Sequence, residues 1–234
     1  MRGCMPQIRA HLARPMTLSS MGKNLLRYLI GPTLASGVGL AAGVLGQVPE
    51  PVVVGVLTQA WGSDWEDEGR TRLLSVLAAD PREPVRWAVA DAIGGGGEWD
   101  SELLDILQKL AADSAACVRN AAAAALPILL ESATILRRLE VIAAWAVSAE
   151  TGLRVAASRA LASTLTIPAA DLVLELLASD RNPEVRRGAL MAVRERFSLF
   201  SDVACRISEP CLYDPQPSVR RLARRLFVQS QAQA

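Results

Sequence analysis

The chain has 234 residues, of which 51% are hydrophobic and only 4% aromatic, with the hydrophobic excess in Ala and Leu. This composition favours closely packed helices over strands, which are richer in Val, Ile, Tyr and Phe. The formal net charge is +1, so no overall field points to nucleic acid or to a membrane surface.

The residues that carry common active-site chemistry are scarce. His11 is the one histidine, which argues against histidine metal centres and against nucleophiles activated by histidine. The four cysteines form no C-x-x-C pair and indicate free thiols in a reducing compartment. We therefore expect a cytoplasmic protein with no catalytic residue, no metal site, no cofactor and no evident small-molecule substrate.

Residues 1–24 are expected to form an irregular, basic arm. Residues 1–49 contain five basic residues and no acidic one, a pattern shared with organellar transit peptides and signal anchors. A targeting role for the arm therefore stays open. Residues 28–45 are apolar, but they contain one proline and four glycines, and their last third matches the helices that follow. We interpret that part as a buried helix and expect no membrane span.

From about residue 70 to residue 229 the sequence repeats itself, which is typical of stacked helical repeats. An apolar residue followed by arginine recurs at spacings of 33, 35, 32 and 34 residues, and a turn residue stands five positions before each apolar residue. The pairs are Val85-Arg86, Val118-Arg119, Leu153-Arg154, Val185-Arg186 and Val219-Arg220, and the turn residues are Asp80, Asp113, Ser148, Asp180 and Asp214.

Each repeat is predicted to be a pair of helices. If the apolar residue of each pair is position 0, positions 4, 7 and 8 are also small or apolar, so these four share one face of a second helix, helix B. Apolar residues three, six and seven places before the turn residue predict a first helix, helix A. An earlier copy over about residues 33–62 has Val53 where the arginine belongs, and we interpret it as a degenerate first repeat.

The phrase DPQPSVRRLA at residues 214–223, with looser copies upstream, resembles the short bacterial type of HEAT repeat over roughly four fifths of the chain. The resemblance implies an all-α fold, an α-solenoid of about six HEAT-like hairpins in one domain over residues 25–234. It also implies an Asp/Arg ladder between repeats, with the B helices on the concave side. The ladder residues would be Asp80, Arg86, Asp113, Arg119, Arg154, Asp180, Arg186, Asp214 and Arg220.

Two features depart from that pattern or invite another interpretation. Ser148 replaces the aspartate of the third unit and Gly152 replaces its proline, which puts one rung of the ladder in doubt. The run from Gly94 to Gly97 lacks the Lys-Ser/Thr of a phosphate loop and falls between two repeats, so we interpret it as a linker.

Function is predicted from the side of helix B opposite the core, at positions 2, 5, 6 and 9. Residues 50–150 carry 16 acidic and 8 basic residues, whereas residues 181–234 carry 5 and 10, so charge is sorted along the chain. We expect a non-catalytic scaffold or adaptor that binds an acidic protein surface, with Trp87 as an aromatic anchor. The candidate partner-binding residues are Trp87, Asp91, Asn120, Arg159, Arg187, Arg194, Arg221, Arg224 and Arg225.

Other interpretations remain open. The arginines could instead be a polar cap on the last repeat, or the basic C-terminal third could bind nucleic acid. Trp87 with Asp91 is similar to the aromatic and carboxylate residues of HEAT-like alkylpurine DNA glycosylases, although here the pair stands in the acidic part of the chain. The bilin lyases of phycobiliproteins share the repeat phrase but supply no motif that can be placed here. The di-iron hydroxylase built from HEAT repeats needs His-Glu pairs, which this chain lacks.

Overall fold

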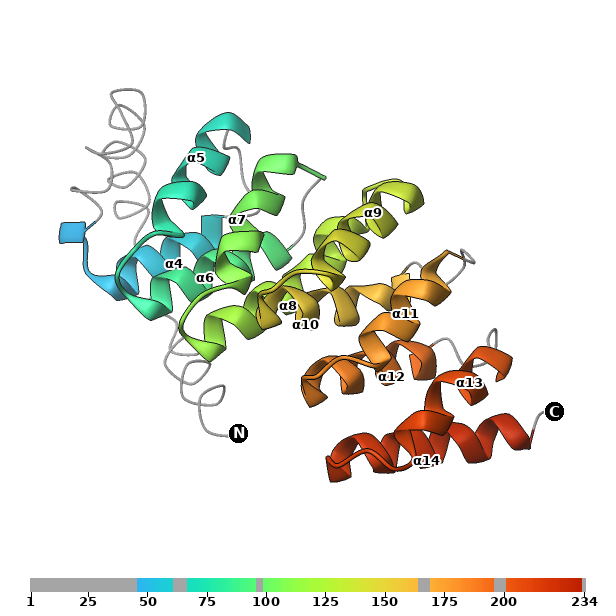
Figure 1. The fold of residues 1–234 in the computed structure, drawn as a ribbon. Coiled ribbons are helices and arrows are strands. Elements are labelled where there is room, and N and C mark those ends of the chain that lie inside the picture. Colours follow the sequence, from blue (N-terminus) through green and yellow to red (C-terminus); the bar gives the residue numbers. More distant parts are fainter. Residues whose placement is uncertain (1–45, 61–66, 96–98, 164–168, 196–200, 233–234) are drawn as a thin grey trace. The chain divides into compact units, whose positions relative to one another are not determined.

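The computed structural model describes residues 46–60, 67–95, 99–163, 169–195 and 201–232, and these contain helices and no strand (Figure 1). The predicted arm, the apolar segment 28–45 and the second half of the glycine run, Gly96 and Gly97, lie outside the described residues. The helices are α4 (Glu50–Ala60), α5 (Asp67–Leu77), α6 (Glu83–Gly94), α7 (Ser101–Ala111), α8 (Ala116–Leu130), α9 (Ile135–Ala146), α10 (Thr151–Ala160), α11 (Ala170–Ala178), α12 (Pro183–Glu195), α13 (Ser201–Cys211) and α14 (Pro217–Gln231), with a 3₁₀ turn at Leu161–Ser163.

The chain divides inside α8 into two compact units, one up to Ala125 and one from Leu126 onward. In the first unit α6 packs against α4, α5 and α7, and α5 packs against α7. In the second unit α10, α12 and α14 form one row, and α9, α11 and α13 form the other. Each unit is a two-layer stack of helical hairpins, so the predicted all-α class of fold is confirmed. None of the helices described above is long and apolar enough to cross a lipid bilayer.

In each unit the apolar core lies between the two layers of helices and follows the predicted register. Leu74, Leu107 and Leu174, each six places before a turn residue, have no exposed surface. Val85, Val118, Val185 and Val219, at position 0 of their repeats, are equally buried. Trp145 and Cys211, each three places before a turn residue, are buried as well. The register therefore predicts the core almost residue by residue.

Successive B helices approach each other at small residues. A Cβ atom placed on Gly188 of α12 would lie 2.0 Å from the Oγ atom of Ser158 on α10 and 2.8 Å from its Cβ atom. Ser158 is at position 5 of its repeat, and it is fully buried, as are Ala90 and Leu190 at the same position of theirs. The expectation that position 5 lies opposite the core is therefore wrong for these repeats, because position 5 is not on an open face.

Candidate functional site

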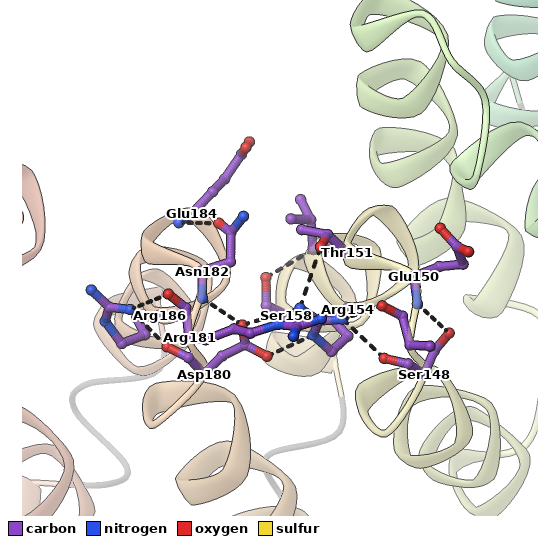
Figure 2. Close-up of polar contacts among 12 residues, drawn as sticks. Ser148, Glu150, Thr151, Arg154, Ser158, Asp180, Arg181, Asn182, Glu184 and Arg186 are labelled. Carbon is purple, nitrogen blue, oxygen red and sulfur yellow. Dashed lines mark hydrogen bonds and ion pairs between the residues drawn. The ribbon is translucent and has the colours of Figure 1, made fainter.

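Three arginines of the repeated apolar-Arg pair bind the carboxylate of the following turn. In each, Nε and Nη2 donate to the two carboxylate oxygens, a fork geometry that suits guanidinium and carboxylate. Figure 2 shows this arrangement around Arg154, whose side chain is only 6% exposed. The Nε–Oδ2 distance is 2.6 Å for Arg86–Asp113, for Arg154–Asp180 and for Arg186–Asp214.

The same arginines are also anchored to their own turns. Nη1 of Arg154 donates to the carbonyls of Ser148 and Ala149, at 2.9 and 2.8 Å. The Nη1 atoms of Arg86 and Arg186 bind the two equivalent carbonyls, and so do those of Arg119 and Arg220. Each of these arginines therefore binds the turn of its own repeat through Nη1 and leaves its Nε–Nη2 edge for the turn of the following repeat.

Ser148 keeps one of the two tasks of the aspartate that it replaces. Oδ1 of Asp113 and Asp180 accepts a hydrogen bond from the backbone N–H two residues later, at 2.7 Å in both cases, which shapes the turn before helix B. Oγ of Ser148 accepts the equivalent bond from Glu150 at 3.1 Å. Because a hydroxyl group carries no negative charge, this rung keeps the hydrogen bond that shapes the turn and loses only the ion pair.

A different residue replaces the arginine missing from the first repeat. Arg82 donates from Nε and Nη2 to both carboxylate oxygens of Asp80, at 2.8 and 2.6 Å. Its Nη1 donates to the carbonyl of Val48 at 2.7 Å. Val48 stands in the first repeat where Pro81 stands in the second, so Arg82 connects these two turns as an arginine at Val53 would. Sequence reasoning missed this residue because it lies outside the repeated register.

These contacts favour the ionised form of the carboxylates. Burial acts to raise the pKa of Asp113, but hydrogen bonds from Arg86 and from the N–H of Ala115 outweigh it, and the pKa lies below its ordinary value. For Asp214 the hydrogen bond from Arg186 is the largest effect, and the pKa is again lowered. The ion pairs of Asp113 and Asp214 therefore contribute stability only while these two carboxylates are charged.

We expect the free energy of unfolding to fall as the pH drops below about 4, the ordinary aspartate range. A carboxyl whose pKa is lower in the folded state stabilises the fold above its unfolded pKa and loses that contribution as pH falls through the folded pKa. Urea denaturation at pH 6, 4 and 3 measures this. Asp214→Asn should show a smaller loss between pH 6 and 3 than the unchanged chain, and an equal loss would show that Asp214 does not contribute.

The predicted basic residues come together on two helices of the second unit. We call Arg187 and Arg194 of α12 with Arg221, Arg224 and Arg225 of α14 the C-terminal arginine surface. All five side chains are exposed, and within the described part of the chain none of them forms an ion pair. A pocket of about 590 Å³ is lined by Arg194, Arg224, Arg225, Leu226, Val228 and Gln229.

A second, smaller pocket of about 180 Å³ lies between α10 and α12. Its lining includes Arg159, Arg187 and Met191 together with Glu184 and Glu195. Arg159 pairs with Glu184 at 3.2 Å, and both side chains are at least one third exposed, so this ion pair adds little stability. This pocket is mixed in charge, whereas the larger one presents arginine and apolar side chains.

The structure corrects the prediction for Trp87. The residue is only 6% exposed, because α6 is enclosed by neighbouring helices and buries seven of its twelve residues. Trp87 is therefore a core residue and cannot serve as an aromatic anchor for a partner, nor stack on a nucleotide as the glycosylase interpretation requires. Asp91 and Asn120 are exposed, but they belong to the first unit, whereas the C-terminal arginine surface belongs to the second.

The described residues offer little reactive chemistry. No group of three or more His, Cys, Asp or Glu side chains among them is placed to hold a metal ion. Cys117, Cys205 and Cys211 are free thiols. Burial raises the pKa of Cys211, and the nearby Asp214 adds to that effect, so this thiol is not activated as a nucleophile.

Comparison with known proteins informs the fold and not the activity. No family model matches the sequence, and no curated protein matches it. The structure is similar to the crystal structure of Cex1p, with a TM-score of 0.57 and 18% sequence identity over 90% of this chain. The chain spans 43% of the length of that structure. At this level of identity the similarity shows the helical fold alone.

Proposed function

We propose that this chain is a non-catalytic adaptor of the HEAT-like repeat class that binds an acidic segment of another protein through the C-terminal arginine surface. The observation that carries the proposal is the contrast between two groups of arginines. Those of the ladder are largely buried and engaged by carboxylates or carbonyls. Those of the surface are exposed and, among the described residues, form no ion pair. Their charge is therefore available to a partner.

The surroundings of these arginines favour a protein partner over nucleic acid. Val228, 66% exposed, lines the larger pocket with them, and Met191 lies in the smaller one. Arg and Met are enriched in protein interfaces. Glu184 and Glu195 in the smaller pocket would repel a phosphate backbone. Phe227 of α14 is the one aromatic residue in helices α12 and α14, and it is half-buried. These two helices therefore provide no open aromatic surface on which bases could stack.

Nucleic-acid binding is the alternative, favoured by one observation. Helix α14 carries four arginines and no acidic residue in 15 residues. A phosphate-binding surface loses affinity steeply as salt rises, with a log–log slope close to the number of phosphates neutralised.

The test compares a fluorescent 20-residue peptide of Asp, Glu and Ala with a 20-nucleotide DNA strand, each titrated at 50 and 200 mM salt. We expect Arg221→Glu/Arg225→Glu to weaken peptide binding at least tenfold, since each charge reversal turns attraction into repulsion. Arg137→Glu/Arg181→Glu makes the same change in net charge at exposed sites outside α14 and should leave affinity within about twofold.

Two outcomes would contradict the proposal. Equal losses in the two double variants would mean that only net charge matters. Tighter binding of DNA than of the peptide, with a steep salt dependence, would support the nucleic-acid alternative instead. Capture of partners from a lysate by both variants, followed by mass spectrometry, then identifies which acidic proteins depend on α14.

A further inference from the structure

The last arginine of the ladder, Arg220, is held like the others, and like Arg119 it has no carboxylate partner among the described residues. Its Nη1 donates to the carbonyls of Asp214 and Pro215, at 2.6 and 2.8 Å. These are the contacts that Nη1 of Arg186 makes with Asp180 and Arg181, at 2.7 and 3.1 Å. Within the described residues, Nε and Nη2 of Arg220 bond to no acceptor.

Because the guanidinium is planar and rigid, fixing Nη1 also fixes the direction of the Nε–Nη2 edge. In Arg86, Arg154 and Arg186 this edge holds an aspartate with Nε–Oδ2 at 2.6 Å. Arg220 therefore presents a binding fork whose orientation is set before any ligand arrives. Ligands gain affinity at such a site because less conformational freedom is lost on binding.

Arg220 lies on one face of α14 with Arg224, Phe227 and Val228, four to eight residues further along; we call this the outer face of α14. Arg224 stands at position 5 of its repeat, where Ala90, Ser158 and Leu190 are buried in the earlier repeats. An exposed arginine at a helix-packing position does not suit a further apolar hairpin. It suits a partner that brings negative charge, with Val228 as an apolar contact.

We propose, building on the adaptor function above, that the Arg220 fork is a receptor for one aspartate side chain of the partner, which thereby adds a rung to the ladder. The ladder itself defines the ligand. In each of the three rungs the aspartate opens a turn before a helix, and its Oδ1 atom also accepts the N–H two residues later, at 2.7 Å. The expected ligand is therefore an aspartate in the turn just before a partner helix, with its carboxylate presented end-on.

A second copy of this chain is a poor source of that aspartate. In the first repeat the residue five places before Val52 is Gln47, and residues 1–49 contain no acidic residue. The first aspartate of the ladder, Asp80, is already bound by Arg82. A copy joined end to end in the register of the repeats would bring the amide of Gln47 to Arg220, so a different, acidic protein fits better.

The test uses three 12-residue acidic helical peptides that differ only in the first residue, Asp, Asn or Glu, followed by proline. We expect the Asp peptide to bind on the order of tenfold more tightly than the Asn peptide, because a charged, bidentate hydrogen bond is lost with Asn. Glu should rank between them, since its longer side chain misplaces the carboxylate. The ¹⁵N–¹H resonance of the Arg220 Nε–H group should shift with the Asp peptide and stay in place with Asn.

Arg220→Lys keeps the charge and removes the fork, so it should abolish the preference for Asp over Asn while retaining general attraction to both peptides. Arg221→Lys, the neighbouring change, should leave the preference intact. Equal affinity for the Asp and Asn peptides, or an Arg220 resonance that does not shift, would overturn the proposal that Arg220 is an aspartate receptor. If Arg221→Glu/Arg225→Glu still loses peptide binding in that case, the adaptor function survives. If light scattering shows that the unchanged chain self-associates and that Arg220→Lys does not, a second copy of the chain occupies the fork instead.

Discussion

Replacing Arg154 by methionine is expected to lower the free energy of unfolding by about 3–5 kcal/mol. The guanidinium makes five hydrogen bonds, to Asp180, Ser148, Ala149 and Thr151. Methionine fills a similar volume but leaves the carboxylate of Asp180, 10% exposed, without its counter-charge. Urea denaturation followed by circular dichroism measures the change.

The matched control for Arg154 is Arg137→Met. Arg137 pairs with Glu140 on the surface of α9, and the two side chains are 49% and 64% exposed, so its loss should cost less than about 0.5 kcal/mol. Arg154→Met/Asp180→Asn should recover part of the stability, because the uncompensated charge is gone. Equal effects of Arg154→Met and Arg137→Met would refute a structural role for the ladder.

Gly188→Ala should destabilise the protein by about 1–3 kcal/mol, the usual effect of overpacking. The sign of the change is informative, because in an open helix the same substitution stabilises by about 1 kcal/mol. Here the new Cβ would lie 2.0 Å from Oγ and 2.8 Å from Cβ of Ser158, so α10 and α12 must move apart. Thermal and urea unfolding at neutral pH measure the difference.

Removal of the hydroxyl tests the cause. Ser158→Ala/Gly188→Ala eliminates the 2.0 Å contact but keeps the 2.8 Å one, so the double variant should be more stable than Gly188→Ala and less stable than the unchanged chain. A stabilising effect of Gly188→Ala by itself would mean that these helices are not in close contact.

The repeat explains how much could be predicted from the sequence. Positions that recur in every unit meet the same surroundings in every unit, so the buried leucines of helix A follow from the spacing. The partners of Arg86 and Arg186 follow from the ladder that the resemblance to HEAT repeats implies. Features that depend on a particular neighbour do not follow. Trp87 is at a position predicted to be open, yet it is buried. Arg82 takes over the role of the arginine missing from the first repeat, but it does not stand at the arginine position of any repeat, so the spacing does not predict it.

The Arg82 contact also changes how the first unit can open. Arg82 and Asp80 are two residues apart in one turn, so detachment of α4 from α6 would break the hydrogen bond to Val48 and leave the carboxylate neutralised. Separation of α12 from α14 would instead pull Arg186 away from Asp214 and expose two unmatched charges. The contact of α4 with α6 can therefore open at lower electrostatic cost than that of α12 with α14, and amide hydrogen exchange should be faster there.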